Sequence, residues 1–202
     1  MKKVFLYTKF NRFWHWMQAL FIILLAVTGF EIHGTFTLFG YNAAFRLHNI
    51  LAWSLIILTA FAIFWHITTG QWKQYIPTRK FLKEMIRFYL SGIFKGEPHP
   101  VKKTEISKLN PLQRITYTFL KTVIIPLQIL TGVIYFFYNS WGDIGLSGWT
   151  LGPVAMLHTL GAFLLSAFAI IHIYLTTTGE TLFSNIKAMI TGWERVEDHA
   201  ES

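Results

Sequence analysis

Residues 157–175 read LHTLGAFLLSAFAIIHIYL, an apolar run with a histidine near each end. The run lies inside a longer stretch, Ile144 to Gly179, that contains no Asp, Glu, Lys or Arg. Such a stretch is typical of a transmembrane helix, which needs about 20 apolar residues to cross a hydrocarbon core about 30 Å thick. His158 and His172 are separated by an α-helical rise of about 21 Å and nearly a whole number of turns. Both imidazoles therefore point the same way, near opposite edges of the membrane.

Histidines in a membrane span indicate a bound partner. A polar ring in lipid is costly, and ionisable residues inside a membrane are functional candidates by default. Haem iron is a suitable partner, because imidazole is a standard axial ligand and the macrocycle is itself apolar. The chain contains no cysteine, which excludes disulfides, cysteine-ligated iron–sulfur clusters and covalently attached c-type haem. Any haem would be held by side-chain ligands and packing alone.

The whole chain has the composition of a membrane protein. Of its 202 residues, 53% are hydrophobic and 14% are charged, against about 25% charged residues in a soluble domain. The deficit comes from four charge-free stretches: Phe13–Phe30, Leu47–Trp72, Thr122–Gly142 and Ile144–Gly179. We expect an all-α integral membrane protein, a single domain over residues 1–202 with a four-transmembrane-helix bundle. The expected spans are about 12–32, 45–70, 111–138 and 152–178.

The distribution of charge predicts the orientation. The net charge is +8, and sixteen of the 18 Lys and Arg lie in residues 2–12, 73–114 and 187–195. The two other loops, around 31–45 and 139–151, contain no Lys or Arg. Under the positive-inside rule this pattern places both termini and the long middle loop in the cytoplasm. The same clustering accounts for the basic charge without a nucleic-acid partner.

Two shorter segments are predicted to be interfacial amphipathic helices. Residues 78–94 follow Pro77, with Thr78 as a plausible N-cap, and combine a broad apolar face with a basic one. This pattern is typical of a helix lying in the cytoplasmic membrane interface. Residues 180–193 predict a second, shorter interfacial helix, followed by a charged tail.

The spans also resemble one another in pairs. The second and fourth each start with Leu-His and end in Thr-Thr-Gly, and the first and third each contain a Thr-Gly pair, Thr28-Gly29 and Thr131-Gly132. Apolar helices match by chance easily, so the similarity is weak support for an internal repeat. A repeat would fit a two-fold arrangement of paired ligands.

Five histidines lie in or at the spans: His15, His48, His66, His158 and His172. Antiparallel threading places His48 and His158 at one outer level, and His15 and His172 at one inner level. We therefore expect two bis-histidine haems, one at each level. His66 lies about one turn below His172, where it could replace His15 as ligand, bond a haem propionate or line a quinone pocket. A hydrogen-bonded core histidine is the alternative for any single one of them.

Two cations are candidates for contact with haem propionates. Arg46 lies next to the outer pair and Lys121 lies inside the third span; snorkelling to the interface is the alternative for both. His33, His99 and His199 lie outside the spans and are interpreted as solvated.

Several motifs together resemble the dihaem b-type cytochrome family. They are NRFWHW at 11–16, RLHN at 46–49, the run at 157–175, KLNPLQRITY at 108–117, LTGVIYFF at 130–137 and ETLFSNIKAMITGWE at 180–194. That family includes the membrane subunits of respiratory formate dehydrogenase, nickel–iron hydrogenase and thiosulfate reductase. The resemblance covers nearly the whole chain and implies a bacterial cytoplasmic (inner) membrane protein with two b haems.

The resemblance also implies a quinone site. In the family, menaquinone or ubiquinone binds beside the cytoplasmic haem, near the start of the third span. Asn110 and Gln113 match the polar positions there, and amide side chains suit a quinone carbonyl. Pro111 and Leu112 depart from the formate branch, which has small residues there, and this leaves the quinone type and pocket shape open. Without the resemblance, helix capping by Asn110 and a solvated Gln113 would be preferred.

The predicted function is electron transfer between an attached redox partner at the outer face and the quinone pool. The partner would be a molybdopterin enzyme, a hydrogenase or a multihaem cytochrome c. The chain would then be the electron-transfer, quinone-reactive subunit of a membrane oxidoreductase complex. A stand-alone dihaem quinone reductase that oxidises superoxide has a similar architecture. A proton or metal transporter and a purely structural anchor without haem are the remaining alternatives.

Overall fold

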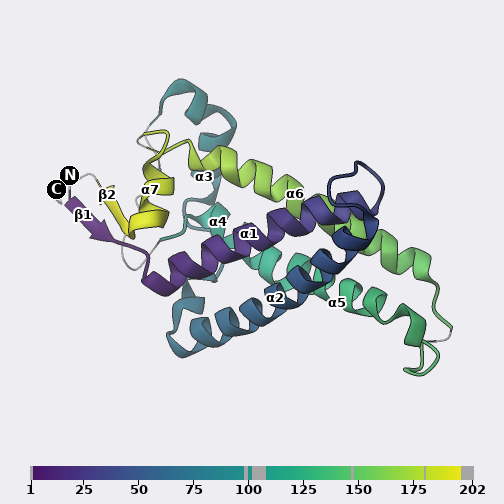
Figure 1. Ribbon diagram of the computed structural model, residues 1–202. Coiled ribbons are helices and arrows are strands. Elements are labelled where there is room, and N and C mark those ends of the chain that lie inside the picture. Colours follow the sequence, from purple (N-terminus) through teal and green to yellow (C-terminus); the bar gives the residue numbers. More distant parts are fainter. Residues whose placement is uncertain (1, 98–99, 102–107, 147, 180, 197–202) are drawn as a thin grey trace. The chain divides into compact units, whose positions relative to one another are not determined.

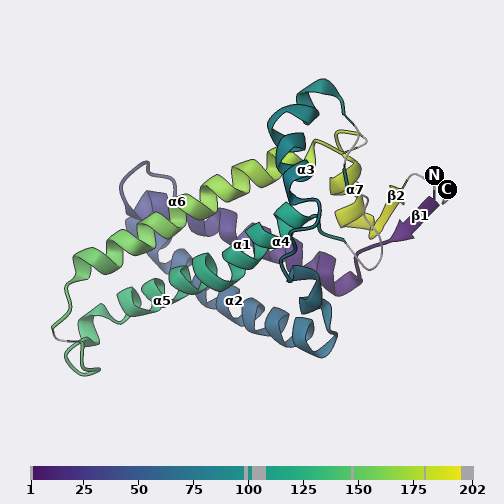
Figure 2. The ribbon, with the colours of Figure 1, turned by 180° about the vertical axis from the view of Figure 1, so that it is seen from behind.

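The computed structural model describes residues 2–97, 100–101, 108–146, 148–179 and 181–196. Within these residues, four helices are long and apolar enough to cross a membrane, as predicted (Figure 1, and Figure 2 from behind). They are α1 (Lys9–Ile32), α2 (Tyr41–Thr68), α4 (Pro111–Phe119) continuing into α5 (Ile125–Phe136), and α6 (Leu151–Thr176). Their ends lie within about four residues of the expected spans, which is ordinary scatter for helix boundaries.

The third span is interrupted in its middle. A π-helical turn, Leu120–Ile124, joins α4 to α5, and Pro126 stands in the first turn of α5. Proline has no N–H to donate, and its ring clashes with the carbonyl four residues earlier, so a regular ladder cannot run through this point. The π turn carries Lys121 at its second position.

The helix predicted at 78–94 starts later in the segment between α2 and α4 and changes type along its length. Its described helical pieces are a 3₁₀-helix (Gln71–Tyr75), α3 (Leu82–Arg87), a π-helix (Phe88–Gly92) and a 3₁₀-helix (Ile93–Lys95). The predicted start at Thr78 is wrong by four residues, because Phe81 has a left-handed backbone (φ 59°) that cannot belong to a helical turn. The hydroxyl of Thr78 instead accepts the Lys80 N–H at 3.2 Å, within a turn before α3.

The two ends of the described chain form a small sheet that the sequence did not predict. β1 (Lys2–Phe5) pairs antiparallel with β2 (Trp193–Val196), where a charged tail is expected from the sequence, and Phe5 lies opposite Trp193. Figures 1 and 2 show the pair beside α7 (Ser184–Thr191), the second predicted interfacial helix. Gly192, with φ 87°, makes the turn between α7 and β2, and a Cβ there would lie 2.6 Å from the Tyr7 carbonyl oxygen.

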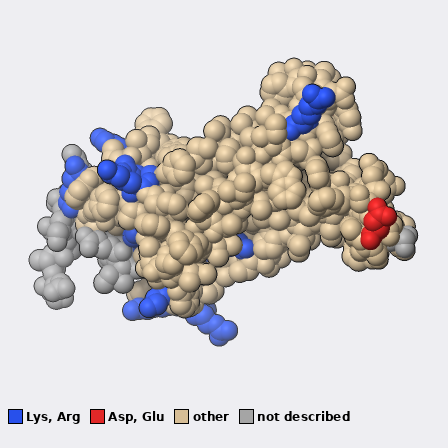
Figure 3. All heavy atoms as spheres, turned by 60° about the horizontal axis from the view of Figure 1, so that its bottom comes forward, with Lys and Arg blue, Asp and Glu red and all other residues tan. Residues whose placement is uncertain are grey.

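The described chain divides into two compact units, and each span runs from one into the other. Unit 1 lies within residues 1–17, 61–118 and 171–202, and unit 2 within 18–60 and 119–170. Unit 2 has four charged residues: Glu31, Arg46, Lys121 and Asp143. On the face shown in Figure 3, most of the surface accordingly carries no Lys, Arg, Asp or Glu. Large apolar side chains cover it, as expected for helices that contact lipid.

Candidate haem-ligand pairs

Two histidine pairs face each other across neighbouring helices, in the combinations that the sequence predicts. In unit 2, the rings of His48 on α2 and His158 on α6 have centroids 6.4 Å apart and planes inclined at 72°. In unit 1, the rings of His15 on α1 and His172 on α6 have centroids 6.1 Å apart and planes inclined at 55°. We call these the outer pair and the inner pair. All four rings are half-buried.

The spacing of both pairs fits two axial ligands of one iron. An imidazole nitrogen binds a first-row metal at about 2.0–2.1 Å, and its ring centroid lies about 1.1 Å farther back, so two rings on opposite sides of a metal have centroids about 6.3 Å apart. The observed separations of 6.1 and 6.4 Å lie on either side of this value. Among the described residues, no group of three or more His, Cys, Asp or Glu could hold a bare metal ion.

Each ring of the outer pair is bonded to a threonine of the adjacent helix. The Oγ1 of Thr28 on α1 lies 2.9 Å from Nδ1 of His48. The Oγ1 of Thr131 on α5 lies 3.1 Å from Nδ1 of His158. In both rings the bond is made at Nδ1, which leaves Nε2 as the nitrogen that can bind a metal.

The glycine after each threonine lies against the same ring. A Cβ added at Gly29 would lie 3.4 Å from Cε1 of His48, which is ordinary contact. A Cβ added at Gly132 would lie 3.0 Å from Cε1 of His158, which is tighter than normal contact. The two Thr-Gly pairs therefore make the same contacts. In each, the threonine is hydrogen-bonded to a histidine ring and the glycine leaves space for that ring.

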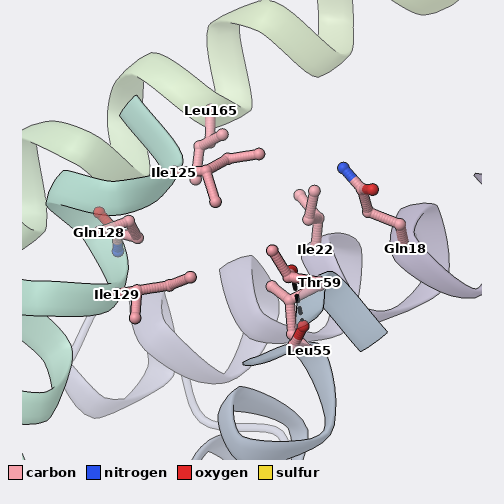
Figure 4. Close-up of a pocket in the computed structure, with 8 residues that line it drawn as sticks. All are labelled: Gln18, Ile22, Leu55, Thr59, Ile125, Gln128, Ile129 and Leu165. Atoms are coloured by element: carbon pink, nitrogen blue, oxygen red, sulfur yellow. Dashed lines mark hydrogen bonds between the residues drawn. The ribbon is translucent and has the colours of Figure 1, made fainter. Parts of the chain in front are cut away.

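Gln128 joins the outer pair to a small cavity in unit 2. Its Nε2 lies 3.2 Å from Nε2 of His158, and its Oε1 is buried without a partner among the described residues. Figure 4 shows Gln128 on the wall of a cavity of about 30 Å³, lined by Gln18, Ile22, Leu55, Thr59, Ile125, Gln128, Ile129 and Leu165. A cavity of this size has room for about two water molecules. The unpaired amide oxygen is the kind of group that an ordered water satisfies.

The inner pair has a different environment. Nδ1 of His15 is buried and has no hydrogen-bond partner among the described residues. The His15 ring meets the Trp16 ring edge-on at 5.2 Å, and the His172 ring meets the Tyr117 ring at 6.4 Å. Aromatic rings therefore pack around the inner pair, where hydroxyl groups and glycines pack around the outer pair.

His66 is a buried, hydrogen-bonded histidine in unit 1. Its Nδ1 lies 2.6 Å from the Ala62 carbonyl oxygen, which can only accept, so Nδ1 is the donor. Its Nε2 then accepts from the hydroxyl of Tyr75 at 3.3 Å. Burial raises the pKa of Tyr75 to about 12, so this phenol keeps its proton at physiological pH. Tyr75 thus occupies the Nε2 lone pair of His66, as Gln128 occupies that of His158, so an iron at either nitrogen would have to displace a hydrogen bond.

Asn110 and Gln113 form a reciprocal cap at the start of α4. The Gln113 N–H donates to Oδ1 of Asn110 at 2.8 Å, and the Asn110 N–H donates to Oε1 of Gln113 at 3.0 Å. This is the geometry of a capping box. Nδ2 of Asn110 also donates to the hydroxyl of Tyr89 at 3.1 Å. Burial raises the pKa of Tyr89, against the opposing effect of the Asn110 bond. The Nε2 group of Gln113 has no partner among the described residues.

The remaining candidates occupy scattered positions. Arg46 is exposed on α2, two residues before His48, and Lys121 is half-buried in the π turn of unit 2. His33 is exposed, as predicted, and its Nε2 lies 3.4 Å from Oγ1 of Thr159. His99 and His199 lie outside the described residues.

Sequence reasoning did not assign roles to Thr28, Thr131, Gln128 and Tyr75. The recurring Thr-Gly pair was a usable signal for the two threonines, but only the contact between helices reveals which rings they serve. Tyr75 follows the second span without a distinguishing pattern, and Gln128 is one polar residue in an apolar run.

Comparison with known proteins adds independent information. Residues 6–192 match the family described as prokaryotic cytochrome b561. The chain is 32% identical over 203 residues to a protein of Escherichia coli (strain K12) named as the cytochrome YdhU, covering 96% of this chain and 76% of that one. Two proteins named as Ni/Fe-hydrogenase B-type cytochrome subunits also match. The Rhodobacter capsulatus protein is 29% identical, covering 96% of this chain and 82% of its own length. The Cupriavidus necator protein is 26% identical, covering 98% and 89%. No solved structure gives a significant match.

Proposed function

The chain belongs to the prokaryotic cytochrome b561 family, and on that premise we propose that it holds two b haems and connects a redox partner to the quinone pool. Family membership confirms the resemblance to b-type cytochromes that the sequence motifs indicate. The protein is thus a multi-pass membrane cytochrome b, an electron-transfer subunit with haem as its cofactor. The proposal goes further than family membership. It concerns the number of haems, their ligands, the quinone, the partner and the orientation.

The observation that carries the proposal is the matched spacing of the two histidine pairs. His48 with His158 would hold one haem, and His15 with His172 the other. Haem bound between each pair would supply reversible one-electron exchange. The residues supply ligation, and the apolar helices exclude water. The bond between Gln128 and Nε2 of His158 must be given up when a metal takes that nitrogen, since a ring nitrogen has one lone pair.

His15 is the preferred inner ligand. Its Nδ1 is unbonded among the described residues, and its ring faces that of His172 at the separation of an axial pair. The His66 ring instead contacts the Trp14 ring, with centroids 5.2 Å apart, and is bonded to Ala62 and Tyr75. We place His66 beside the inner site and not among its ligands. It could contact a quinone or a propionate there if it exchanged its bond with Tyr75 for one with that group.

The quinone site is proposed at the start of α4. Both side-chain oxygens of Asn110 and Gln113 are used by the capping box, so the available group is the Nε2 amide of Gln113, a donor suited to a quinone carbonyl. Tyr89, held by Asn110, is a second hydroxyl at the same position in unit 1. The capping box would then hold the Gln113 amide in a fixed orientation toward the quinone.

The positive-inside pattern supports an orientation with both termini in the cytoplasm of a bacterium. The inner pair and the quinone site would then lie at the cytoplasmic side of the inner membrane, and the outer pair at the opposite side. Arg46 and Lys121 remain candidates for propionate contact at the outer pair. The relatives named as hydrogenase subunits favour a catalytic redox partner, at the outer face in this orientation. A molybdopterin enzyme and a multihaem cytochrome c are the other partner classes.

Haem content tests the ligand assignment directly. The full chain is purified in detergent, and haem per polypeptide is measured by the pyridine haemochrome assay. We expect two haems in the wild type, one in His158→Ala, one in His172→Ala, and two in both His66→Ala and the exposed control His33→Ala. Two haems in either of the first two variants, or one in His66→Ala, would show that the ligand assignment is wrong.

Copurification distinguishes the proposed subunit from a stand-alone enzyme. A tagged chain isolated in mild detergent from its own membranes should bring down a large catalytic or multihaem subunit. A chain that is isolated alone and reduces quinone with superoxide as donor would support the stand-alone reading instead.

A further inference from the structure

We propose that Thr28 and Thr131 are positioning residues that fix the tautomer of the outer pair and lower the midpoint potential of the haem bound there. Each threonine accepts the Nδ1–H of one ring, which holds the Nε2 nitrogens of His48 and His158 unprotonated. The inference rests on the proposed function, because it takes these two histidines as the ligands of one haem.

The direction of each bond follows from a count of hydrogens. The hydroxyl of Thr28 donates its one hydrogen to the Leu24 carbonyl oxygen at 2.8 Å. Its contact with Nδ1 of His48, at 2.9 Å, must therefore be a bond in which the ring donates. Thr131 repeats the arrangement: it donates to the Leu127 carbonyl oxygen at 2.7 Å and accepts from Nδ1 of His158 at 3.1 Å.

The Gln128 amide agrees with the same tautomer at His158. Its amide nitrogen is a donor, and it lies 3.2 Å from Nε2 of that ring. A donor at this position requires a lone pair on Nε2, and hence a proton on Nδ1. The threonine on one side of the ring and the amide on the other therefore agree on a single tautomer.

Burial makes these bonds effective. Thr28 is 0% exposed and Thr131 is 6% exposed, so water does not compete for either hydroxyl. A hydrogen bond in such a dry site is stronger than in water. A ligand histidine that donates its other N–H becomes a more basic ligand and is held in one orientation. A more basic imidazole stabilises oxidised iron more than reduced iron, which lowers the potential.

The tautomer is tested first, on the protein without haem. Chains labelled with ¹⁵N-histidine are prepared from a haem-deficient host, and ring nitrogen shifts are compared between Thr28→Val, Thr131→Val, the matching serine variants and wild type. Wild type and the serine variants should give one tautomer, protonated at Nδ1, for His48 and His158. Each valine variant should add the other tautomer at its own histidine, and more of it at His48 than at His158, where the Gln128 amide still favours a proton on Nδ1. Unchanged shifts in both valine variants would overturn the proposal.

The potential is tested on the haem-loaded chain in a His172→Ala background, which should retain the haem of the outer pair. Thr28→Val and Thr131→Val should each raise the midpoint potential and weaken haem binding by about 10- to 100-fold. The serine variants should restore the original potential. Thr59→Val is the matched control, because among the described residues the Thr59 hydroxyl bonds its own helix alone, at the Leu55 carbonyl oxygen, within the same unit.

The outcomes separate this inference from the function on which it rests. Loss of haem in the valine variants with retention in the serine variants supports a role for the hydroxyl. Equal loss in both would mean that packing rather than the hydrogen bond is responsible, and would overturn the proposal. Two haems in the wild type with unchanged potential in every variant would also overturn it, leaving the proposed function intact. A wild-type chain that binds no haem would refute the proposed function itself.

Discussion

The outer and inner pairs each bring two histidine rings to nearly the same separation, 6.4 and 6.1 Å between ring centroids, but their surroundings differ. In the outer pair, each ring is bonded through Nδ1 to a buried threonine and lies on a glycine. In the inner pair, Nδ1 of His15 has no partner among the described residues, and aromatic rings form the contacts. The two pairs therefore share a ring spacing, while the contacts that the neighbouring helices make with the rings differ.

The two environments suit different tasks. A ring fixed by a hydroxyl and a glycine has one orientation and one tautomer, which suits a site that only holds and exchanges electrons. Unit 1, which contains the inner pair, also contains the capping box of α4, Tyr89, and the bond between His66 and Tyr75. Quinone chemistry needs protons as well as electrons, and these exchangeable groups belong to the unit that holds the inner pair. The comparison predicts that added bulk beside His158 displaces its ring, and that changes in unit 1 outside the two histidines of the inner pair affect quinone exchange more than haem retention.

The largest expected effect comes from filling the space beside His158. Gly132→Val should displace this ring and reduce the haem content from two to one per chain, because even a Cβ at position 132 would lie 3.0 Å from Cε1. Gly29→Ala should leave both haems in place, since its Cβ would make ordinary contact at 3.4 Å with His48. Alanine is also favoured over glycine in a helix by about 0.5–1 kcal/mol. Pyridine haemochrome assays on both variants decide the matter, and a full haem complement in Gly132→Val would remove the distinction between the pairs.

An intermediate effect is expected at the proposed quinone site. Gln113→Glu keeps the oxygen that accepts the Asn110 N–H but removes the amide hydrogens that would bond a quinone. Reduction of the haems by a water-soluble quinol analogue should slow roughly tenfold, the equivalent of one lost hydrogen bond. Haem content and thermal stability should stay at the wild-type level, because an acidic residue in the first helical turn is favourable.

Asn110→Ala is the structural counterpart to this variant. It removes the cap and the bond to Tyr89, and should cost about 1 kcal/mol of stability. If Gln113→Glu destabilises the chain as much as Asn110→Ala and leaves the quinol rate unchanged, the two amides are a cap and nothing more.

The sequence predicted the parts of this molecule that depend on periodicity and composition. The four spans follow from charge-free length, and the pairing of His158 with His48 and of His172 with His15 follows from helical spacing and antiparallel depth. Contacts between helices could not be predicted in this way. The role of Thr28 toward His48 depends on the rotation of α1 against α2, which a single sequence does not encode in any local pattern.

Two local features also escaped prediction, for different reasons. The left-handed Phe81 delays α3, although phenylalanine has no particular preference for that conformation. The pairing of β1 with β2 joins segments from opposite ends of the chain, and four-residue strands have too few positions for a periodic pattern. The capping box was readable, since an Asn followed three residues later by Gln before an apolar run is a helix-start signature.

The smallest expected effect concerns the hydroxyl of Tyr75, and it tests whether His66 stands apart from the inner ligands. Tyr75→Phe removes the hydrogen bond to Nε2 of His66 without adding bulk. Because His66 is not an assigned ligand, both haems should remain and the low-spin haem spectrum should not change. A changed spectrum would indicate that His66 has become a ligand.

The pH dependence of stability tests the same hydroxyl. The pKa of Tyr75 is raised from 10.0 to about 12 in the folded chain. A raised folded pKa means that the unfolded chain loses this proton first, so the stabilisation is complete below pH 10 and is lost as pH rises toward 12. Between pH 9 and pH 11.5, the free energy of unfolding should therefore fall more in the wild type than in Tyr75→Phe, and the difference should be at most about 3 kcal/mol. Equal losses, measured by tryptophan fluorescence in detergent, would show that the phenol is not buried against His66, and His66 would again compete with His15 as ligand.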